Sequence, residues 1–161
     1  MRPLPALALA LLLALSSPAA AETWRRYLDA GSGFSISLPT DRFTLTDRSE
    51  GRLTFAERGG SAQLDVFGVE NRDALSARQF RRMMEGADPH RRITYRAGGR
   101  SWFVLSGYIE GEAEPTIFYA KFMLNRSGTA LSAFEISYPR SRKAEFDATV
   151  ERLEDTLTAP D

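Results

Sequence analysis

The sequence of 161 residues contains no cysteine, and this absence excludes several kinds of chemistry at once. Without cysteine the chain has no disulfide, no thiolate metal site and no cysteine nucleophile. A lipid attached to an N-terminal cysteine is excluded as well. The hydrophobic core alone must stabilise the fold, and 43% hydrophobic residues, including ten Phe and two Trp, are typical of a globular protein.

Histidine and lysine are nearly as scarce. His90 is the only histidine, so a histidine relay or metal site has one possible member, and "DPHRR" places it beside a turn, where an exposed histidine is the favoured interpretation. Two Lys stand against 19 Arg, which suggests a GC-rich coding bias. The formal net charge is zero, which does not favour nucleic acid as a partner. We expect no cofactor and no bound metal.

No apolar run after residue 21 reaches the roughly 20 residues needed to span a membrane. Residues 1–21 have the pattern of a secretory signal peptide, with an arginine at the start, the apolar run "ALALALLLAL" and a small-residue end. We predict cleavage after Ala21 and one α+β domain over residues 22–161. An uncleaved membrane anchor is the alternative. The expected location is the periplasm of a Gram-negative bacterium, with secretion as the weaker option.

Strand patterns dominate the remaining chain. In "FSISLP", three apolar residues alternate with serine before a proline, and "WRRYL" precedes it across the loop "DAGSG". Later strands are expected in "RITYRA", "RSWFVLSGYIEG", "PTIFYAKFML" and "TALSAFEISYP", joined by short turns. Residues 102–105 and 117–124 are apolar at successive positions, as expected for strands covered on both faces.

Two helices are predicted. The spacing Ser76-x-x-Gln79 is a capping box, and the first helix should end at Gly86. The second spans residues 141–157 with an apolar stripe of Phe146, Val150, Leu153 and Leu157. The last four residues, 158–161, should fray. This order of elements predicts an α+β fold, an antiparallel sheet sandwiched between helical layers.

Two patterns invite a catalytic or metal-binding interpretation that we do not favour. Ser106 lacks the G-x-S-x-G motif and lies inside a strand, where a small serine and Gly107 more often allow a close approach of neighbouring backbone. Glu110, Glu112 and Glu114 alternate and could gather a cation, but a solvated loop is the simpler interpretation.

The clearest charge feature is a run of arginines with few acidic neighbours. Its members are Arg78, Arg81, Arg82, Arg91, Arg92, Arg96 and Arg100. Guanidinium groups bind carboxylate and phosphate bidentately, so a surface that presents these residues together would suit an acidic protein, lipid head group or glycan. We select Arg81, Arg82, Arg91 and Arg92 as the candidate binding residues. A surface that is arginine-rich through coding bias alone remains the alternative.

Several segments carry a resemblance to known proteins: "GFSISLP", "WFVLSG", "FYAKF", "FEISYP" and "FDATVERLEDTL". They resemble small exported alphaproteobacterial proteins without an assigned activity. In the order of elements the chain is similar to the PsbP-like α/β/α sandwich superfamily. That resemblance implies an accessory or binding role and carries no catalytic residue.

The sequence thus predicts a periplasmic accessory or binding module without catalytic activity, monomeric or weakly associating. Its expected partner is an envelope protein or an anionic glycan or lipid. One alternative is a hydrolase that uses Ser106 or carboxylates. Another is a small-molecule or lipid carrier with a cavity lined by Trp102, Phe118, Tyr119 and Phe134.

Overall fold

A computed structural model of the chain describes residues 22–49, 51–111 and 114–161. The predicted signal peptide, residues 1–21, lies outside the described residues. Within the described ranges, none of the helices has the length and apolar character required to cross a membrane. The elements follow one another as β1 (Trp24–Leu28), β2 (Ser35–Pro39), β3 (Phe43–Ser49), β4 (Arg52–Glu57), β5 (Gln63–Glu70), α1 (Ala77–Glu85), β6 (Arg91–Gly98), β7 (Trp102–Ile109), β8 (Thr116–Leu124), β9 (Ala130–Pro139), a short 3-10 turn (Arg140–Arg142) and α2 (Lys143–Thr156).

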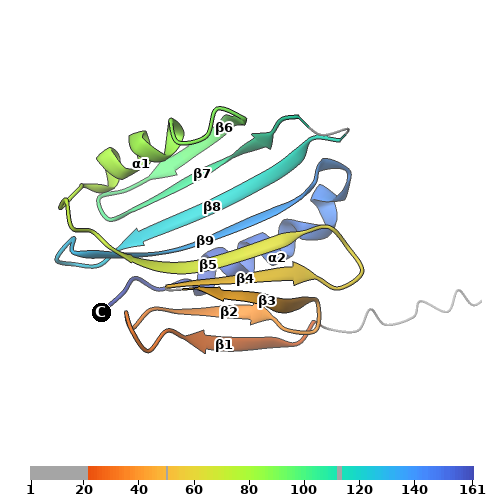
Figure 1. The fold of residues 1–161 in the computed structure, drawn as a ribbon, viewed down its shortest axis with the longest axis horizontal. Helices are drawn as coiled ribbons and strands as arrows, with labels where there is room; N and C mark the ends of the chain where they lie inside the picture. The colour runs from red at the N-terminus through yellow and green to blue at the C-terminus, as the bar shows by residue number, and fades with distance from the viewer. Residues whose placement is uncertain (1–21, 50, 112–113) are drawn as a thin grey trace, which may run out of the picture.

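Seven of these strands form one antiparallel sheet in the order β3-β4-β5-β9-β8-β7-β6 (Figure 1). The other two, β1 and β2, pair with each other as a separate antiparallel hairpin. Strands that follow one another after α1 are neighbours, and the last strand, β9, is inserted between β5 and β8. Short turns join antiparallel neighbours, whereas parallel neighbours need crossover segments. The predicted antiparallel sheet is confirmed.

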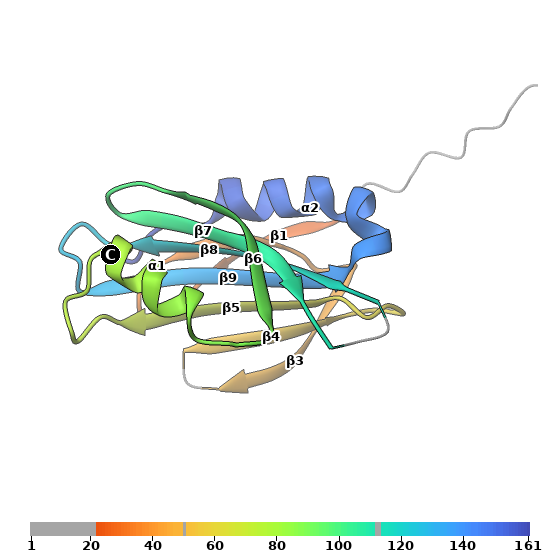
Figure 2. The same ribbon diagram turned by 90° about the horizontal axis from the view of Figure 1, so that it is seen from above.

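The two faces of the sheet carry separate cores. Along β8, Phe118 and Ala120 pack on the face that holds α1, whereas Ile117 packs in the core beneath α2. The predicted stripe of α2, from Phe146 to Leu157, is buried in the core beneath α2, together with the inner residues of β2. Figure 2 shows α2 along one side of the sheet and α1 on the other.

The α+β class is confirmed, but helical layers on both sides are not confirmed. One face is covered by α2 together with the β1–β2 hairpin. On the other face α1 packs against β6 and β7. A helix of nine residues is about 13 Å long, too short to cover seven strands about 4.8 Å apart. The residues of β4 and β5 on that face accordingly stay exposed or half-buried.

The end of the described chain is hydrogen-bonded to the domain, so the predicted fraying of residues 158–161 is wrong. Thr158 N donates to Ser35 O at 2.9 Å, and its carbonyl accepts from Ser132 Oγ at 2.7 Å. Asp161 N donates to Ser32 O at 3.1 Å. These contacts tie the last residues to the β1–β2 hairpin and to β9.

Candidate functional site

Helix α1 begins with the predicted capping box. Ser76 Oγ accepts from Gln79 N at 3.4 Å, and Gln79 Oε1 accepts from Ser76 N at 2.9 Å. The helix ends at Gly86. Its apolar residues pack in the core between α1 and the sheet: Ala77, Phe80 and Met84. Of the arginines between these positions, Arg78 and Arg82 are exposed and Arg81 is half-buried.

The turn between β6 and β7 brings the chain back to the start of α1. Gly99 N donates to Trp102 O at 2.9 Å and closes the turn. A Cβ on Gly99 would lie 2.5 Å from Nε1 of the Trp102 indole, so only glycine lets the backbone approach the ring this closely. Arg100, at the tip of the turn, thereby lies beside the first turn of α1.

Helix α1 and this turn enclose a pocket of about 460 Å³, which we call the arginine pocket. Its lining residues are Ala77, Arg78, Arg81, Gly98, Gly99, Arg100, Trp102 and Phe103. Three of them carry a guanidinium group, one carries an indole, and none carries a carboxylate. This composition suits an anion, because guanidinium groups donate forked hydrogen bonds to carboxylate or phosphate oxygens.

The charges of the arginine pocket are only partly compensated. Arg78 and Arg100 are exposed and form no ion pair with any residue in the described ranges. Arg81 Nε lies 3.5 Å from Glu85 Oε1, yet it is buried and makes no hydrogen bond. Glu85 also accepts from Arg96 Nε at 3.1 Å, so one carboxylate faces two cations. The charge of Arg81 is therefore shared with one carboxylate, whereas Arg78 and Arg100 have no counterion in the described ranges.

The four arginines selected from the sequence have different surroundings. Arg81 lines the arginine pocket, and Arg82 is exposed in the last turn of α1. Arg91 and Arg92 lie at the start of β6, at the opposite end of that strand from the turn. Arg78 and Arg100 belong to the basic run of the sequence but are not among the four selected residues.

Arg91 is paired within the fold. Its Nη1 and Nη2 donate to the two carboxylate oxygens of Glu135 at 2.8 and 2.6 Å, and its guanidinium lies over the ring of Phe118, 4.7 Å from the centroid. The Glu135 carboxylate raises the pKa of Arg91 above its ordinary value. Arg92 Nε donates to Glu110 at 2.8 Å, and both side chains are exposed. An anion would have to compete with these carboxylates.

The pair Ser106-Gly107 has a structural role in the strand β7. Ser106 Oγ donates to the Phe118 carbonyl of β8 at 2.8 Å. A Cβ on Gly107 would overlap the Arg92 carbonyl oxygen of β6, opposite a bulge between Ile93 and Tyr95. The small residues therefore allow a close backbone approach, as the sequence predicts.

The remaining candidates also have local surroundings. His90 is exposed in the turn before β6, and its backbone N–H donates to Asp88 Oδ1. Glu110 binds Arg92, Glu114 Oε1 accepts from Ser141 N at 2.8 Å, and Glu112 lies outside the described residues. No group of three His, Asp or Glu side chains suited to a metal ion occurs in the ranges that the structure describes.

The four aromatic residues considered for a carrier cavity do not surround one space. Phe118 and Phe134 are almost fully buried in different cores, on opposite faces of the sheet. Tyr119 stacks on Phe134 and donates to Glu154 at 2.6 Å. Trp102 lines the arginine pocket.

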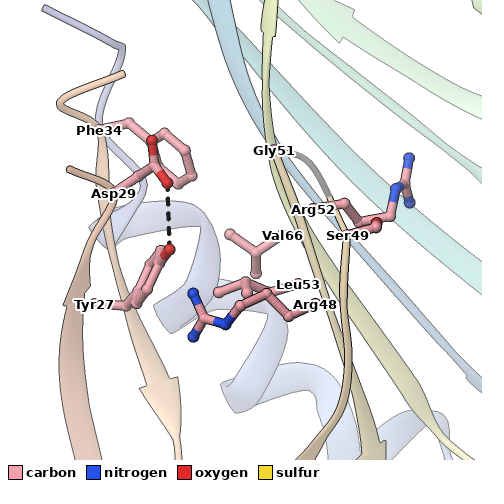
Figure 3. A pocket seen from close by; sticks show the side chains of 9 residues that line it. All are labelled: Tyr27, Asp29, Phe34, Arg48, Ser49, Gly51, Arg52, Leu53 and Val66. Carbon is pink, nitrogen blue, oxygen red and sulfur yellow. Dashed lines mark hydrogen bonds between the residues drawn. The ribbon is translucent and has the colours of Figure 1, made fainter. Parts of the chain in front are cut away.

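A small cavity lies between the β1–β2 hairpin and the turn that joins β3 to β4 (Figure 3). Tyr27 and Arg48 point into it, and Tyr27 Oη donates to Asp29 at 3.3 Å. Hydrogen bonds from Ser32 lower the pKa of Asp29. Its volume of about 60 Å³ is far below the roughly 300–1,000 Å³ of ligand pockets, so it is too small for a ligand.

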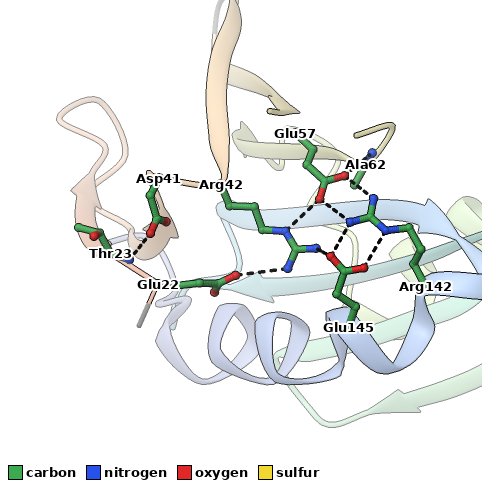
Figure 4. Close-up of polar contacts among 8 residues, drawn as sticks. All are labelled: Glu22, Thr23, Asp41, Arg42, Glu57, Ala62, Arg142 and Glu145. Carbon is green, nitrogen blue, oxygen red and sulfur yellow. Dashed lines mark hydrogen bonds and ion pairs between the residues drawn. The ribbon is translucent and has the colours of Figure 1, made fainter. Parts of the chain in front are cut away.

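The densest ionic cluster joins the start of α2 to β3 and β4 (Figure 4). Glu57, whose side chain is 5% exposed, accepts from Arg142 and from Arg42. Glu145 and Glu22 complete the cluster around the two guanidinium groups. These hydrogen bonds lower the pKa of Glu57 to about 2. A general acid near neutral pH needs a raised pKa, so this cluster is structural.

A scan of protein-family models and a search of curated proteins find no match to the chain. Solved structures do match in fold. The solution structure of PsbP (CyanoP) from Synechocystis has a TM-score of 0.61 and 14% identity, and the match covers 91% of this chain and 98% of that one. The Ran-binding protein Mog1p of Saccharomyces cerevisiae has a TM-score of 0.59 and 8% identity, with 86% and 96% of the two chains covered.

LpqN of Mycobacterium tuberculosis, described as involved in cell envelope biogenesis, has a TM-score of 0.54 and 13% identity over 88% of this chain and 92% of its own. At these identities the likeness concerns the fold. The PsbP-like fold that the sequence resemblance implied is therefore confirmed.

Proposed function

We propose that this chain with the PsbP-like fold is a non-catalytic binding or accessory module, exported to the periplasm, that holds an anionic partner at the arginine pocket. The partner is an envelope protein or an anionic glycan or lipid, and the module is monomeric or weakly associating. Secretion beyond the envelope is the alternative location.

The observation that carries the proposal is the excess positive charge of the pocket. Arg78, Arg81 and Arg100 line it without a carboxylate among the lining residues. In the described ranges only Arg81 has a counterion, Glu85, which also pairs with Arg96. A folded protein gains little from such an arrangement by itself, because like charges repel, and a bound anion would remove this repulsion.

The surroundings of the candidate nucleophile and acids support a non-catalytic role. Ser106 Oγ is bonded to a backbone carbonyl and not to a base. Every described carboxyl group with a clearly shifted pKa is shifted downward, by hydrogen bonds from neighbouring donors: Asp29, Asp41, Glu57, Glu114 and Glu145. Such groups stay ionised and accept hydrogen bonds, and they do not serve as acids at neutral pH.

The descriptions of solved structures with this fold also support a binding or accessory role. Mog1p is named as a Ran-binding protein, and LpqN is described by its part in envelope biogenesis. These descriptions concern those proteins, and they support a binding role for a chain of the same fold.

The experiment is capture of partners from periplasmic extract on the tagged protein, with mass spectrometry of what is retained at increasing salt. We expect a specific partner that is held at low salt and released well below 1 M, because exposed guanidinium contacts are screened by ions. Retention that is indifferent to salt would contradict an ionic site. The variant S106A is the matched control and should capture the same partner.

A further inference from the structure

A second pocket lies directly beside the arginine pocket, on the other side of Arg100. It has a volume of about 670 Å³ and shares Ala77 and Arg100 with the arginine pocket. Its lining residues are Ala74, Leu75, Ser76, Ala77, Gln79, Arg100, Ser101, Leu124, Asn125, Arg126, Ser127 and Gly128. Again no Asp or Glu is among them, although the chain has 21 acidic residues.

The topology explains why these segments meet. β7 and β8 are antiparallel neighbours, so the start of β7 and the end of β8 lie at the same edge of the sheet. Leu124 N donates to Ser101 O at 2.7 Å and ties the two segments together. The turn after β8 therefore presents Arg126 at the same edge as Arg100.

Most neutral polar groups of the second pocket are already hydrogen-bonded inside the protein. Ser76 and Gln79 bond to each other in the cap of α1. Asn125 Oδ1 accepts from the backbone of Thr129, and Ser127 Oγ bonds to the Thr129 hydroxyl at 2.8 Å. The groups left to meet a ligand are mainly guanidinium donors.

These donors select for a ligand rich in anionic oxygens. A neutral sugar needs acceptors for its hydroxyl groups, and lining carboxylates, the usual acceptors, are absent among the residues of both pockets. Four guanidinium groups, those of Arg78, Arg81, Arg100 and Arg126, line the two pockets. A phosphate monoester brings a charge of about −1.5 to −2 at pH 7 and three acceptor oxygens, so two phosphates match four guanidinium groups better than two carboxylates.

We propose that the two pockets together bind a compact ligand with two phosphate groups on one skeleton, such as a bisphosphorylated sugar or sugar head group, one phosphate in each pocket and Arg100 between them. This inference rests on the proposed function and names the class of its anionic ligand.

The test is titration calorimetry of the purified protein with fructose 1,6-bisphosphate, fructose 6-phosphate and citrate as probes. We expect the bisphosphate to bind about tenfold or more tightly than the other two, since a charge-assisted pair contributes about 1.5–3 kcal/mol. R126S should lower the affinity for the bisphosphate about tenfold and bring it close to the affinity of the parent protein for the monophosphate, because the second phosphate loses its arginine. R58S, which removes an exposed arginine elsewhere, is the matched control and should change neither.

Co-sedimentation with phosphatidylcholine vesicles that contain phosphatidylinositol 4-phosphate distinguishes the source of the ligand. Binding to these vesicles, compared with vesicles of equal charge containing phosphatidylglycerol, assigns the ligand to a lipid head group. Binding of the soluble probe alone assigns it to a free sugar phosphate, and either outcome supports the two-phosphate chemistry.

Equal affinity for the bisphosphate and the monophosphate, equal affinity for citrate, or no effect of R126S would overturn this inference. A periplasmic partner that is still captured through Arg78, Arg81 and Arg100 would in that case leave the proposed function standing. If no partner is captured through these three arginines, the proposed function itself fails, because the capture experiment tests the arginine pocket alone.

Discussion

Glu57 and Arg142, 85 residues apart in the chain, form a forked ion pair in which Arg142 Nη1 and Nη2 donate to the two oxygens of Glu57 at 2.6 and 2.8 Å. The pair joins the end of β4 to the 3-10 turn before α2. Glu57 Oε2 also accepts from Ala62 N at 3.2 Å, so the carboxylate holds the β4–β5 turn as well.

Replacing Glu57 by Gln should lower the free energy of unfolding by about 3 kcal/mol, because Arg42 and Arg142 would lose a nearly buried counterion. Chemical denaturation of the variant and the parent measures the difference. The control is E70Q, which removes an exposed pair with Arg72 and should change stability by less than about 1 kcal/mol. Similar effects of the two variants would contradict a structural role for the cluster.

Glu57 should also make the fold sensitive to acid. Its pKa is about 2 in the folded chain against an ordinary value of 4.5. A lowered folded pKa stabilises the fold above the ordinary pKa, and this contribution is lost as pH falls from about 4.5 to about 2. Thermal unfolding over this range should show a steeper decline for the parent than for E57Q. Parallel curves would show that Glu57 is not responsible.

Replacing Gly107 by alanine should destabilise the fold more than replacing Ser106 by alanine, although only Ser106 has a polar side chain. S106A loses one hydrogen bond to Phe118 O and should cost about 1 kcal/mol. G107A places a methyl group on the Arg92 carbonyl and should cost about 1–3 kcal/mol, the usual range for overpacking. G86A, whose Cβ would lie 3.9 Å from the nearest of the neighbouring atoms, is the control. A larger loss for S106A than for G107A would argue against the close backbone approach.

Much of the local structure could be predicted from short patterns. The capping box at Ser76 and Gln79 identifies the start of α1, and the spacing of Phe146, Val150 and Leu153 identifies α2, because each signal lies within a few turns of chain. These elements are confirmed within a residue or two.

Contacts between distant segments could not be predicted in this way. The insertion of β9 between β5 and β8 depends on pairing across many residues, and Thr158 is bonded to Ser35, 123 residues earlier. The terminal segment was therefore expected to fray. Local composition does not reveal such partners.

The candidate site illustrates both cases. The basic run was visible in the sequence, but the selection of Arg91 missed its forked pair with Glu135, 44 residues later. Arg126 was missed altogether. The antiparallel order of β7 and β8 could have pointed to it, since a turn after β8 must lie beside the start of β7.

Export is tested by the mass of the protein recovered from the periplasmic fraction. We predict a chain that begins at Glu22, because the small residues before it match a signal-peptidase site. Replacing Ala21 by Asp should leave the signal attached. An unprocessed protein in the cytoplasmic fraction would contradict the proposed location.

If the arginine pocket holds an anionic partner, loss of its three arginines should weaken binding far more than loss of three arginines elsewhere. The most direct measurement is the dissociation constant of the captured partner for a pocket variant, R78S/R81S/R100S, and for a control, R25S/R58S/R72S, which removes three exposed arginines elsewhere and changes the net charge equally. We predict a loss of about a hundredfold or more for the pocket variant and little change for the control. Equal losses would mean that overall charge binds the partner, and would contradict a binding site at the arginine pocket.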